Sequence, residues 1–386
     1  MRALRIYAGP TARASLAAQG LQPEHVGTIP GAAGGPKGLI LGPMDRFLFG
    51  DWLLRSSQPV DLVGASIGAW RMATACLHEP VAAFERLEHD YIHQHYELAP
   101  GQKRVSADQV SETFGRNLLA FYGGRVPEVL NHPRYRLHIV TSRGRHLLGT
   151  EHKLRTPLGY LGAFLTNTVQ RKAMGAWLER VVFSTGGAGQ AMAPLPFDTR
   201  DYRTRRVLLD DANFNPALQA SCSIPFVLRA IQDIPGAPPG AYWDGGITDY
   251  HLHLNYAAPG LAQSAINSGA TSAYSTRASG INDAKKLVLY PHFQKSVVPG
   301  WLDKGLKWRH RSSPFLDTMV LLAPDPEWVK TLPNSKLPDR TDFTHYGNDL
   351  DARVKAWTRA TRASQQLVDE FIAWLDKPDM NLVHPL

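Results

Sequence analysis

The sequence predicts an α/β fold, because strand-forming runs alternate with glycine turns and helix-forming runs. Two such units stand near the N-terminus, at Val26 to Phe49 and at Val60 to Leu77. Their turns lie about thirty residues apart, which is the length of one strand–helix–strand repeat. Alternation of this kind is typical of a mostly parallel sheet covered by helices.

The first unit carries a glycine-rich loop, Pro30-Gly-Ala-Ala-Gly-Gly-Pro-Lys-Gly38. A P-loop would end in Gly-Lys-Ser/Thr, and a dinucleotide site would need Gly-x-Gly-x-x-Gly with a later carboxylate; neither pattern fits. Gly34 and Gly35, followed by Lys37 and Gly38, instead suit an oxyanion hole, in which backbone N–H groups face a developing negative charge. A plain strand-to-helix turn remains the alternative.

The second unit places a serine at the apex of a sharp turn. Leu62 and Val63 lead into Gly64-Ala65-Ser66-Ile67-Gly68, and a helix-forming run follows. The flanking glycines leave room for a strained backbone, and the serine sits beside the positive end of the helix dipole. Ser66 is therefore a candidate nucleophile, although Gly-x-Ser-x-Gly alone is a weak signal, since its residues are common.

The rest of the chain continues the pattern of alternating elements. The stretch 181–204 is expected to form a loop that contributes to a lid, and 257–283 a flexible surface connection. The other expected helices are Pro80–Leu98, Ser106–Phe121 with a cap at Ser106, Gly159–Arg180, Ala217–Ser223, Pro314–Leu322 and the amphipathic Asp349–Leu375; the other expected strands are Arg136–Thr141, Val207–Leu209, Ala241–Trp243 and Lys286–Tyr290.

Asp244 is a candidate catalytic carboxylate. It follows the expected strand Ala241–Trp243 and opens a glycine turn, Asp244-Gly245-Gly246. An aspartate before two glycines is also a common hairpin turn, so this feature by itself indicates little.

Histidines do not point to a metal site. His93 and His95 fall on different faces of an expected helix, so they cannot easily share an ion. His251 and His253 would share one face of a strand, but no third ligand stands at a suitable spacing. No metal and no cofactor are expected.

Composition limits the class of protein. With 44% hydrophobic residues in a chain of 386, a large core can be buried. The sequence contains no apolar run of about 18 residues, and its first ten residues lack the sustained apolar stretch of a secretory signal, so none is expected. Cys76 and Cys222 are expected to be free, buried thiols in a reducing compartment, which favours the cytoplasm.

The charge balance is basic but does not indicate nucleic-acid binding. The net charge is +8, with clusters at Arg200–Arg206 and Lys304–Arg311. No nucleic-acid-binding motif accompanies them, so a solvated basic face is favoured. Transient contact with an anionic membrane surface remains compatible with this charge. The oligomeric state stays open.

Three motifs in order resemble the patatin-like phospholipase family. They are Ala33-Gly34-Gly35-Pro36-Lys37-Gly38, Gly64-Ala65-Ser66-Ile67-Gly68 and Asp244-Gly245-Gly246, with Asp244 standing 178 residues after Ser66. Ser221-Cys-Ser-Ile-Pro225 is similar to the family's small-residue helix ending. Ala33 replaces the usual first glycine of the loop, and the usual Asn-x-Pro after the aspartate is missing. The resemblance covers about residues 22–292.

The resemblance implies a three-layer α/β/α sandwich and a Ser66–Asp244 dyad without a histidine. It implies that Gly34 and Gly35 form the oxyanion hole near Lys37 and Gly38. The expected substrates are lipid carboxylic esters: phospholipid, lysophospholipid or acylglycerol. Residues 293–386 are then expected to be a helical extension packed on a catalytic domain at 22–292.

Three alternatives remain. An α/β-hydrolase triad could combine Ser66 and Asp244 with His251, His292 or His310. An acyltransferase would pass the acyl group to an alcohol, but Ala65 stands where such enzymes usually carry a histidine. A non-catalytic lipid-binding protein could keep the same fold.

Overall fold

The computed structural model describes residues 1–96, 105–186, 192–258 and 286–386. Within these ranges the strands are β1 Leu4–Ala8, β2 Val26–Gly31, β3 Val60–Ala65, β4 Tyr135–Gly144, β5 Leu178–Ser184, β6 Thr204–Leu208, β7 Ile231–Gln232, β8 Ala241–Asp244, β9 Leu287–Pro291, β10 Met319–Pro324 and β11 Val383–Pro385. The α-helices are α1 Pro10–Gln19, α2 Gly42–Gly50, α3 Ile67–Ala75, α4 Pro80–Ile92, α5 Ala107–Tyr122, α6 Val126–Leu130, α7 Arg155–Val169, α8 Phe214–Ser221, α9 Gly246–Asp249, α10 Pro326–Val329, α11 Thr341–Tyr346, α12 Leu350–Ala363 and α13 Gln365–Asp376.

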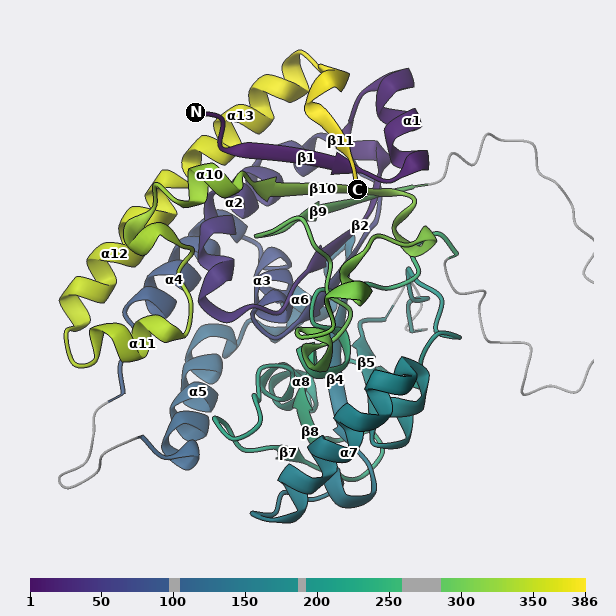
Figure 1. Ribbon diagram of the computed structural model, residues 1–386, viewed down its shortest axis with the longest axis vertical. Helices are drawn as coiled ribbons and strands as arrows, with labels where there is room; N and C mark the ends of the chain where they lie inside the picture. Colours follow the sequence, from purple (N-terminus) through teal and green to yellow (C-terminus); the bar gives the residue numbers. More distant parts are fainter. Residues whose placement is uncertain (97–104, 187–191, 259–285) are drawn as a thin grey trace, which may run out of the picture.

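One mixed sheet joins all the strands of the described residues (Figure 1). Its main order is β11-β1-β10-β9-β2-β3-β4-β5-β6, while β8 pairs with β4 and with β7. The run from β10 through β9, β2 and β3 to β4 is parallel throughout. Antiparallel pairs are β1 with β10, β4 with β5 and with β8, and β7 with β8. The predicted α/β class with a mostly parallel central sheet is confirmed.

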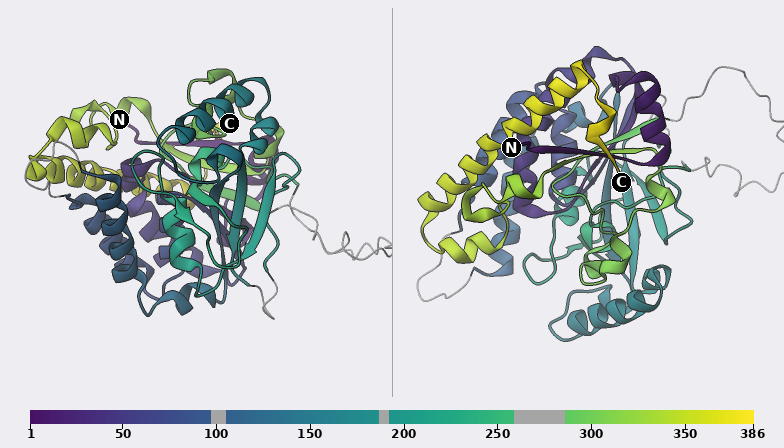
Figure 2. Two further views of the ribbon diagram at one scale, coloured as in Figure 1. Left: turned by 90° about the horizontal axis from the view of Figure 1, so that it is seen from below. Right: turned by 45° about the horizontal axis from the view of Figure 1, so that its top comes forward.

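The middle of the sheet is buried on both faces. Every residue of β3, β9 and β10 is buried, and all but one of those in β2. Such strands read as continuous apolar runs because helices and loops cover both of their sides. On one side α3 packs against β2, β3 and β4, and α2 and α4 lie beside one another. The helices α12 and α13 pack on α2, at one flank of the molecule (Figure 2).

Several local expectations are confirmed. The Ser66 turn joins β3 to α3, and Asp244 ends β8. The hydroxyl of Ser106 caps α5 by accepting from the N–H of Gln109 at 3.2 Å. Cys76 and Cys222 are both free and buried. Among the described residues, no helix has the length and apolar composition needed to cross a bilayer.

Three expected elements were wrong in their bounds or type. The helix expected at Gly159–Arg180 begins at Arg155 and ends at Val169, and β5 then starts at Leu178, so the loop expected from residue 181 begins inside a strand. The helix expected at Pro314–Leu322 is one 3₁₀ turn, Pro314–Leu316, followed by β10. The helical pattern expected at Asp349–Leu375 is confirmed, as two helices that meet at Ser364. Most of the connection expected at 257–283 lies outside the described residues.

The segment 293–386 contributes more than helices. Its strand β10 lies between β1 and β9, and β11 extends the sheet beyond β1. A purely helical extension was therefore wrong for this part of the chain. Its helices α12 and α13 contact α2.

Candidate active site

Ser66 occupies a strained turn between β3 and α3. Its backbone φ is +56° and its ψ −131°, a conformation that costs a non-glycine residue free energy and recurs at functional sites. The glycines around it are required by close packing. A Cβ at Gly64 would lie 2.3 Å from the Cα of Ala69, and a Cβ at Gly68 would lie 1.8 Å from the carbonyl oxygen of Gly31.

The register of the sheet brings Asp244 to Ser66. β3 and β8 pair with the same edge of β4, one after the other. β3 is parallel to β4 and its last pair is Ala65 with Val140. β8 is antiparallel to β4 and its last residue, Asp244, pairs with Thr141. β5 occupies the other edge of β4 over these residues. The carboxyl ends of β3 and β8 therefore meet end to end, which brings together two residues far apart in the sequence.

The two side chains form a direct hydrogen bond. The Oγ of Ser66 donates to Oδ2 of Asp244 at 2.7 Å, and the N–H of Gly246 donates to Oδ1 at 2.7 Å. Both side chains are buried, with only 5% of each residue exposed. One carboxylate oxygen thus faces the serine while the backbone holds the other. The structure brings together the predicted nucleophile and the predicted base.

The two glycines after Asp244 are also required by packing. A Cβ at Gly245 would lie 2.0 Å from the carbonyl oxygen of Val140, and a Cβ at Gly246 would lie 2.6 Å from the Cβ of Ala33. Instead of a hairpin, the turn opens α9. The Asp-Gly-Gly sequence therefore joins β8 closely to both β4 and the glycine loop.

Ser221 holds the turn in place, a role that the sequence did not reveal. Its Oγ accepts from the N–H of Ser66 at 2.9 Å and donates to the carbonyl oxygen of Val140 at 2.7 Å. Ser221 is fully buried at the end of α8. The only signal in the sequence was its place in the small-residue segment that precedes Asp244.

The glycine loop lies beside the serine turn. β2 pairs with β3 up to Gly31 opposite Gly64, so the segments that follow both strands leave the same edge of the sheet. Gly34 precedes a 3₁₀ helix that begins at Gly35, and the first N–H groups of a helix have no partner within it. Gly35 has a φ of +58°, which favours glycine.

Gly38 and Lys37, the other two candidate residues of the glycine loop, contact different parts of the molecule. A Cβ at Gly38 would lie 3.5 Å from Ile67, the residue after the serine, so Gly38 packs against the turn. The Nζ of Lys37 lies 5.5 Å from the ring centre of Phe293. Burial lowers the pKa of Lys37, with Asp339 acting in the opposite direction.

Two cations that the sequence did not connect with the site act on the base. Arg340 and Lys304 are the positive charges that act on Asp244. The Nε of Arg340 would lie 3.5 Å from a Cβ at Gly35, and the Nζ of Lys304 lies 4.0 Å from the ring centre of Tyr250. Lys304 belongs to a basic cluster in the sequence, whereas Arg340 stands in no motif.

Burial raises the pKa of Asp244 to about 6. The hydrogen bonds from Ser66 and Gly246 and the positive charges of Arg340 and Lys304 lower this pKa, but burial has the larger effect. A carboxylate with this pKa is mostly ionised at neutral pH and remains basic enough to take a proton. Its ionised form is the one that can accept the serine proton.

This pKa predicts the pH dependence of any reaction in which Asp244 acts as the base. Below about pH 6 Asp244 is protonated, so kcat/KM for a neutral substrate, such as an ester, is expected to fall about tenfold per pH unit and to level off above about pH 7. Initial rates in a constant-ionic-strength buffer series measure this profile. A flat profile from about pH 5 to 7 would contradict a base of this kind.

Removing a neighbouring cation should move that profile. Because Arg340 and Lys304 lower the pKa of Asp244, Arg340→Met and Lys304→Met are each expected to shift the acid limb upward by about half a pH unit, more at low salt. Arg311→Met, an exposed change in the same basic cluster as Lys304, is the matched control and should leave the limb in place. A shift to lower pH would contradict the assignment.

The three histidines of the alternative triad hydrogen-bond to backbone carbonyl oxygens. His251 Nδ1 lies 3.0 Å from the carbonyl oxygen of Ser296, and His292 Nδ1 lies 2.5 Å from that of Gln294. His310 Nε2 lies 2.9 Å from the carbonyl oxygen of Asp303. In the described part of the chain none of these three rings hydrogen-bonds to Ser66 or Asp244.

No metal cluster emerges from the other histidines. His253 bonds through Nδ1 to the carbonyl oxygen of Val297 at 2.9 Å and through Nε2 to the hydroxyl of Ser313 at 2.8 Å. His93 stacks on His89 at the end of α4. The described ranges hold no group of three or more His, Cys, Asp or Glu side chains placed to bind a metal ion.

A narrow, mostly apolar cavity adjoins the glycine loop and the serine turn. Asp45 and Arg71 form a buried ion pair beside it, with two contacts of 2.7 Å. The residues that line the cavity are Gly35, Gly38, Leu39, Gly42, Asp45, Ile67, Arg71, Phe84, Leu87, Glu88 and Tyr91.

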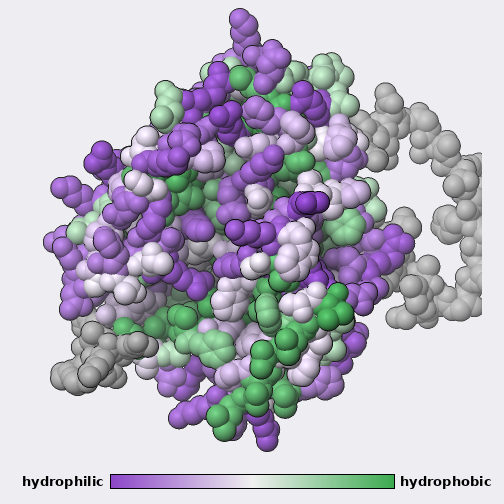
Figure 3. Space-filling model, viewed as in Figure 1, coloured by the Kyte–Doolittle hydropathy of each residue, from purple (hydrophilic) through white to green (hydrophobic). Residues whose placement is uncertain are grey.

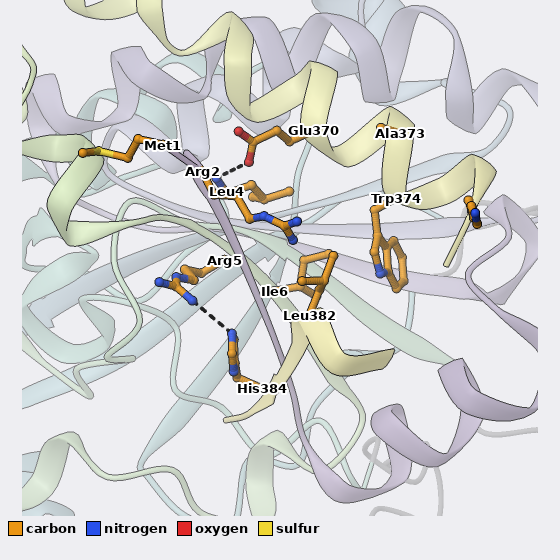
Figure 4. A pocket seen from close by; sticks show the side chains of 11 residues that line it. Met1, Arg2, Leu4, Arg5, Ile6, Glu370, Ala373, Trp374, Leu382 and His384 are labelled. Atoms are coloured by element: carbon orange, nitrogen blue, oxygen red, sulfur yellow. Dashed lines mark hydrogen bonds between the residues drawn. The ribbon is translucent and has the colours of Figure 1, made fainter. Parts of the chain in front are cut away.

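A second pocket, of about 430 Å³, lies between β1 and α13 (Figure 4). There Glu370 accepts the N–H of Leu4 at 2.9 Å, and Arg5 contacts the ring of His384 at 3.3 Å. None of the residues that line it belongs to the Ser66 site.

No protein-family model matches the chain, and no significant match to it exists among curated proteins.

Proposed function

We propose that this chain is a serine acyl hydrolase of the patatin-like type, which cleaves lipid carboxylic esters through an acyl-enzyme on Ser66. The observation that carries the proposal is the 2.7 Å hydrogen bond from Ser66 Oγ to Asp244 Oδ2. A serine hydroxyl at its ordinary pKa is a weak nucleophile and needs a base within hydrogen-bond reach. Three-layer packing around the sheet and a catalytic unit at 22–292 are part of the same proposal.

In the first step Asp244 takes the hydroxyl proton while Ser66 Oγ attacks the ester carbonyl carbon. The N–H groups of Gly34 and Gly35 stabilise the negative charge on the carbonyl oxygen, a contribution of about 10²–10³ in rate for each donor in comparable sites. The bond to the alcohol then breaks, and the alcohol leaves with the proton from Asp244. The acyl group stays on Ser66.

In the second step Asp244 takes a proton from water, and the resulting hydroxide attacks the acyl-enzyme. The bond to Ser66 Oγ breaks, Ser66 regains its proton from Asp244, and the fatty acid is released. The surrounding cations, Lys304 and Arg340, lie where they can keep Asp244 ionised.

Labelling with a fluorophosphonate probe tests this proposal. The native protein should react, and digestion followed by mass spectrometry should place the adduct on Ser66. Protein denatured before the probe is added is the control and should not react. Ester hydrolysis is then measured with p-nitrophenyl esters of increasing chain length and with phospholipid vesicles. A native protein that neither labels nor hydrolyses any ester would favour a non-catalytic lipid-binding protein.

Histidine variants separate the dyad from a triad. His251→Gln, His292→Gln and His310→Gln are each expected to keep kcat/KM within about threefold, because these rings bond to backbone carbonyls instead of the dyad. Thermal unfolding of each variant checks that the buried substitutions are tolerated. A folded variant that loses about a thousandfold in kcat would support a Ser-His-Asp triad instead.

A further inference from the structure

The helix α7 has its apolar side turned toward the outside. Its exposed large side chains recur at spacings of three and four residues, so they lie on one face of the helix. Surface helices normally place polar residues on that side. The exposed side chains of this face are Leu154 at 72%, Leu158 at 59%, Leu161 at 53%, Phe164 at 37%, Leu165 at 56% and Val169 at 88%.

The opposite face of α7 is small and polar, and it is firmly fixed. Its buried residues are Thr156, Gly159, Tyr160, Ala163 and Asn167. Asn167 donates to Oδ1 of the buried Asp303 at 2.8 Å, and Arg309 donates to Asn167 Oδ1 at 3.1 Å. The exposed apolar face is therefore held in this orientation by its own buried contacts.

Further apolar side chains extend this face. Phe226, 61% exposed, contacts Tyr160 of α7 at 5.8 Å between ring centres. Trp308, 63% exposed, precedes Arg309, which donates to the carbonyl oxygen of Thr168 at the end of α7. Figure 3 shows apolar residues gathered over α7 in the lower part of the molecule. We call the six α7-face residues above, with Phe226 and Trp308, the α7 surface; an exposed apolar group of this kind marks an interaction site.

The α7 surface is bordered by cations. The helix itself contains no Asp or Glu. The nearby acidic residue Glu151 accepts the N–H of Ala230 at 3.1 Å. Exposed basic residues stand at both ends of the helix, and within the described residues none of them forms an ion pair. They are Lys153, Arg155, Lys172, Lys307 and Arg311.

We infer that the α7 surface docks on a lipid bilayer that contains anionic lipids. An apolar helix face with basic borders and a tryptophan is the pattern of a helix that lies in the membrane interface. The basic borders match the negative surface of such a bilayer. A second copy of this chain fits less well, since a two-fold contact would place the same cations against one another.

The buried face of α7 packs against the residue that precedes the base. The ring of Tyr160, on the buried side of α7, packs on that of Trp243 at 6.2 Å between centres, and Trp243 immediately precedes Asp244. The buried face of α7 thus adjoins β8, the strand that carries the base, while the exposed face points away from it. Binding itself does not depend on the hydrolase proposal, and each can fail without the other.

Vesicle flotation of the full chain tests the inference. The probe is phosphatidylcholine vesicles with or without phosphatidylglycerol. The wild type is expected to bind the mixed vesicles more tightly. Leu158→Glu with Leu165→Glu should weaken binding about a hundredfold, since each buried leucine is worth about tenfold or more. Leu54→Glu, equally exposed at 60% but on a segment that packs on α2, is the matched control and should bind as the wild type does.

Two further measurements complete the experiment. Lys153→Gln with Lys172→Gln should remove most of the preference for phosphatidylglycerol. Hydrolysis of a soluble short-chain ester should be unchanged in the leucine variant, which separates docking from catalysis. Wild-type protein that binds neither vesicle, or a leucine variant that binds normally, would overturn the inference. A concentration-dependent dimer that the leucine variant abolishes would also overturn it, because a second copy would then be the occupant.

Discussion

Ser66→Ala is expected to lower kcat for ester hydrolysis by about 10⁴-fold or more, since it removes the atom that attacks the carbonyl. Asp244→Asn should cost about 10²–10⁴-fold, because an amide cannot take the proton that the carboxylate accepts at 2.7 Å. Steady-state rates on one neutral p-nitrophenyl ester measure both. Neither variant should label with a fluorophosphonate as fast as the wild type.

The double variant is the sharper measurement. Residues that act as one unit lose activity non-additively, so Ser66→Ala with Asp244→Asn should be no slower than Ser66→Ala alone. Losses that multiply would mean that Asp244 acts independently of the serine. Thermal unfolding serves as the control for folding. Asp244→Asn is expected to keep or raise the melting temperature, since it removes a carboxyl group whose burial raises its pKa to about 6.

The parts of the site that depend on short local patterns could be predicted from the sequence. A tight turn at the end of a strand is predicted by a serine between glycines, and equally by an aspartate before two glycines. The structure explains the glycines by distance: a Cβ at Gly64 or Gly245 would lie within 2.3 Å of neighbouring backbone. Steric requirements at a turn fix the residue type at a few neighbouring positions, so they can be recognised as a short motif in the sequence.

The relation between distant segments could not be predicted from spacing. The residues of Ala241–Asp244 do not by themselves predict that this strand pairs antiparallel with β4 and ends opposite Thr141. Arg340 and Lys304 reach the base from loops of the C-terminal segment, and single cations on loops form no pattern. The role of Ser221 depends on the same tertiary contacts.

The wrong elements share a physical cause. Short apolar runs suit a buried strand and a buried helix equally well. Met319 to Leu322 lay within the helix expected at Pro314–Leu322, but they form part of the strand β10, because β1 and β9 pair with it on both sides. In β5, Glu179 and Arg180 are fully buried charges, which concealed a strand that tertiary ion pairs make possible.

Arg180 leads to the largest expected effect on stability. Its side chain is fully buried in β5, and it donates to both oxygens of Asp249, at 2.7 Å from Nε and 2.6 Å from Nη2. Burial by itself would raise the pKa of Asp249, but the charge and hydrogen bonds of Arg180 hold that pKa below its usual range. The pair ties β5 to α9, the helix that follows Asp244.

Asp249→Leu is expected to lower the free energy of unfolding by about 3–5 kcal/mol, because it leaves the buried guanidinium without its main partner. Urea denaturation followed by circular dichroism measures this. Arg203→Ala, which breaks a bond to Glu179 from a side chain that is 45% exposed, is the control and should cost no more than about 1 kcal/mol. Arg180→Met added to Asp249→Leu should recover part of the loss, since no unpaired charge then stays buried. If the double variant is less stable than Asp249→Leu alone, the loss comes from packing, and the ion pair is not what joins β5 to the helix behind the base.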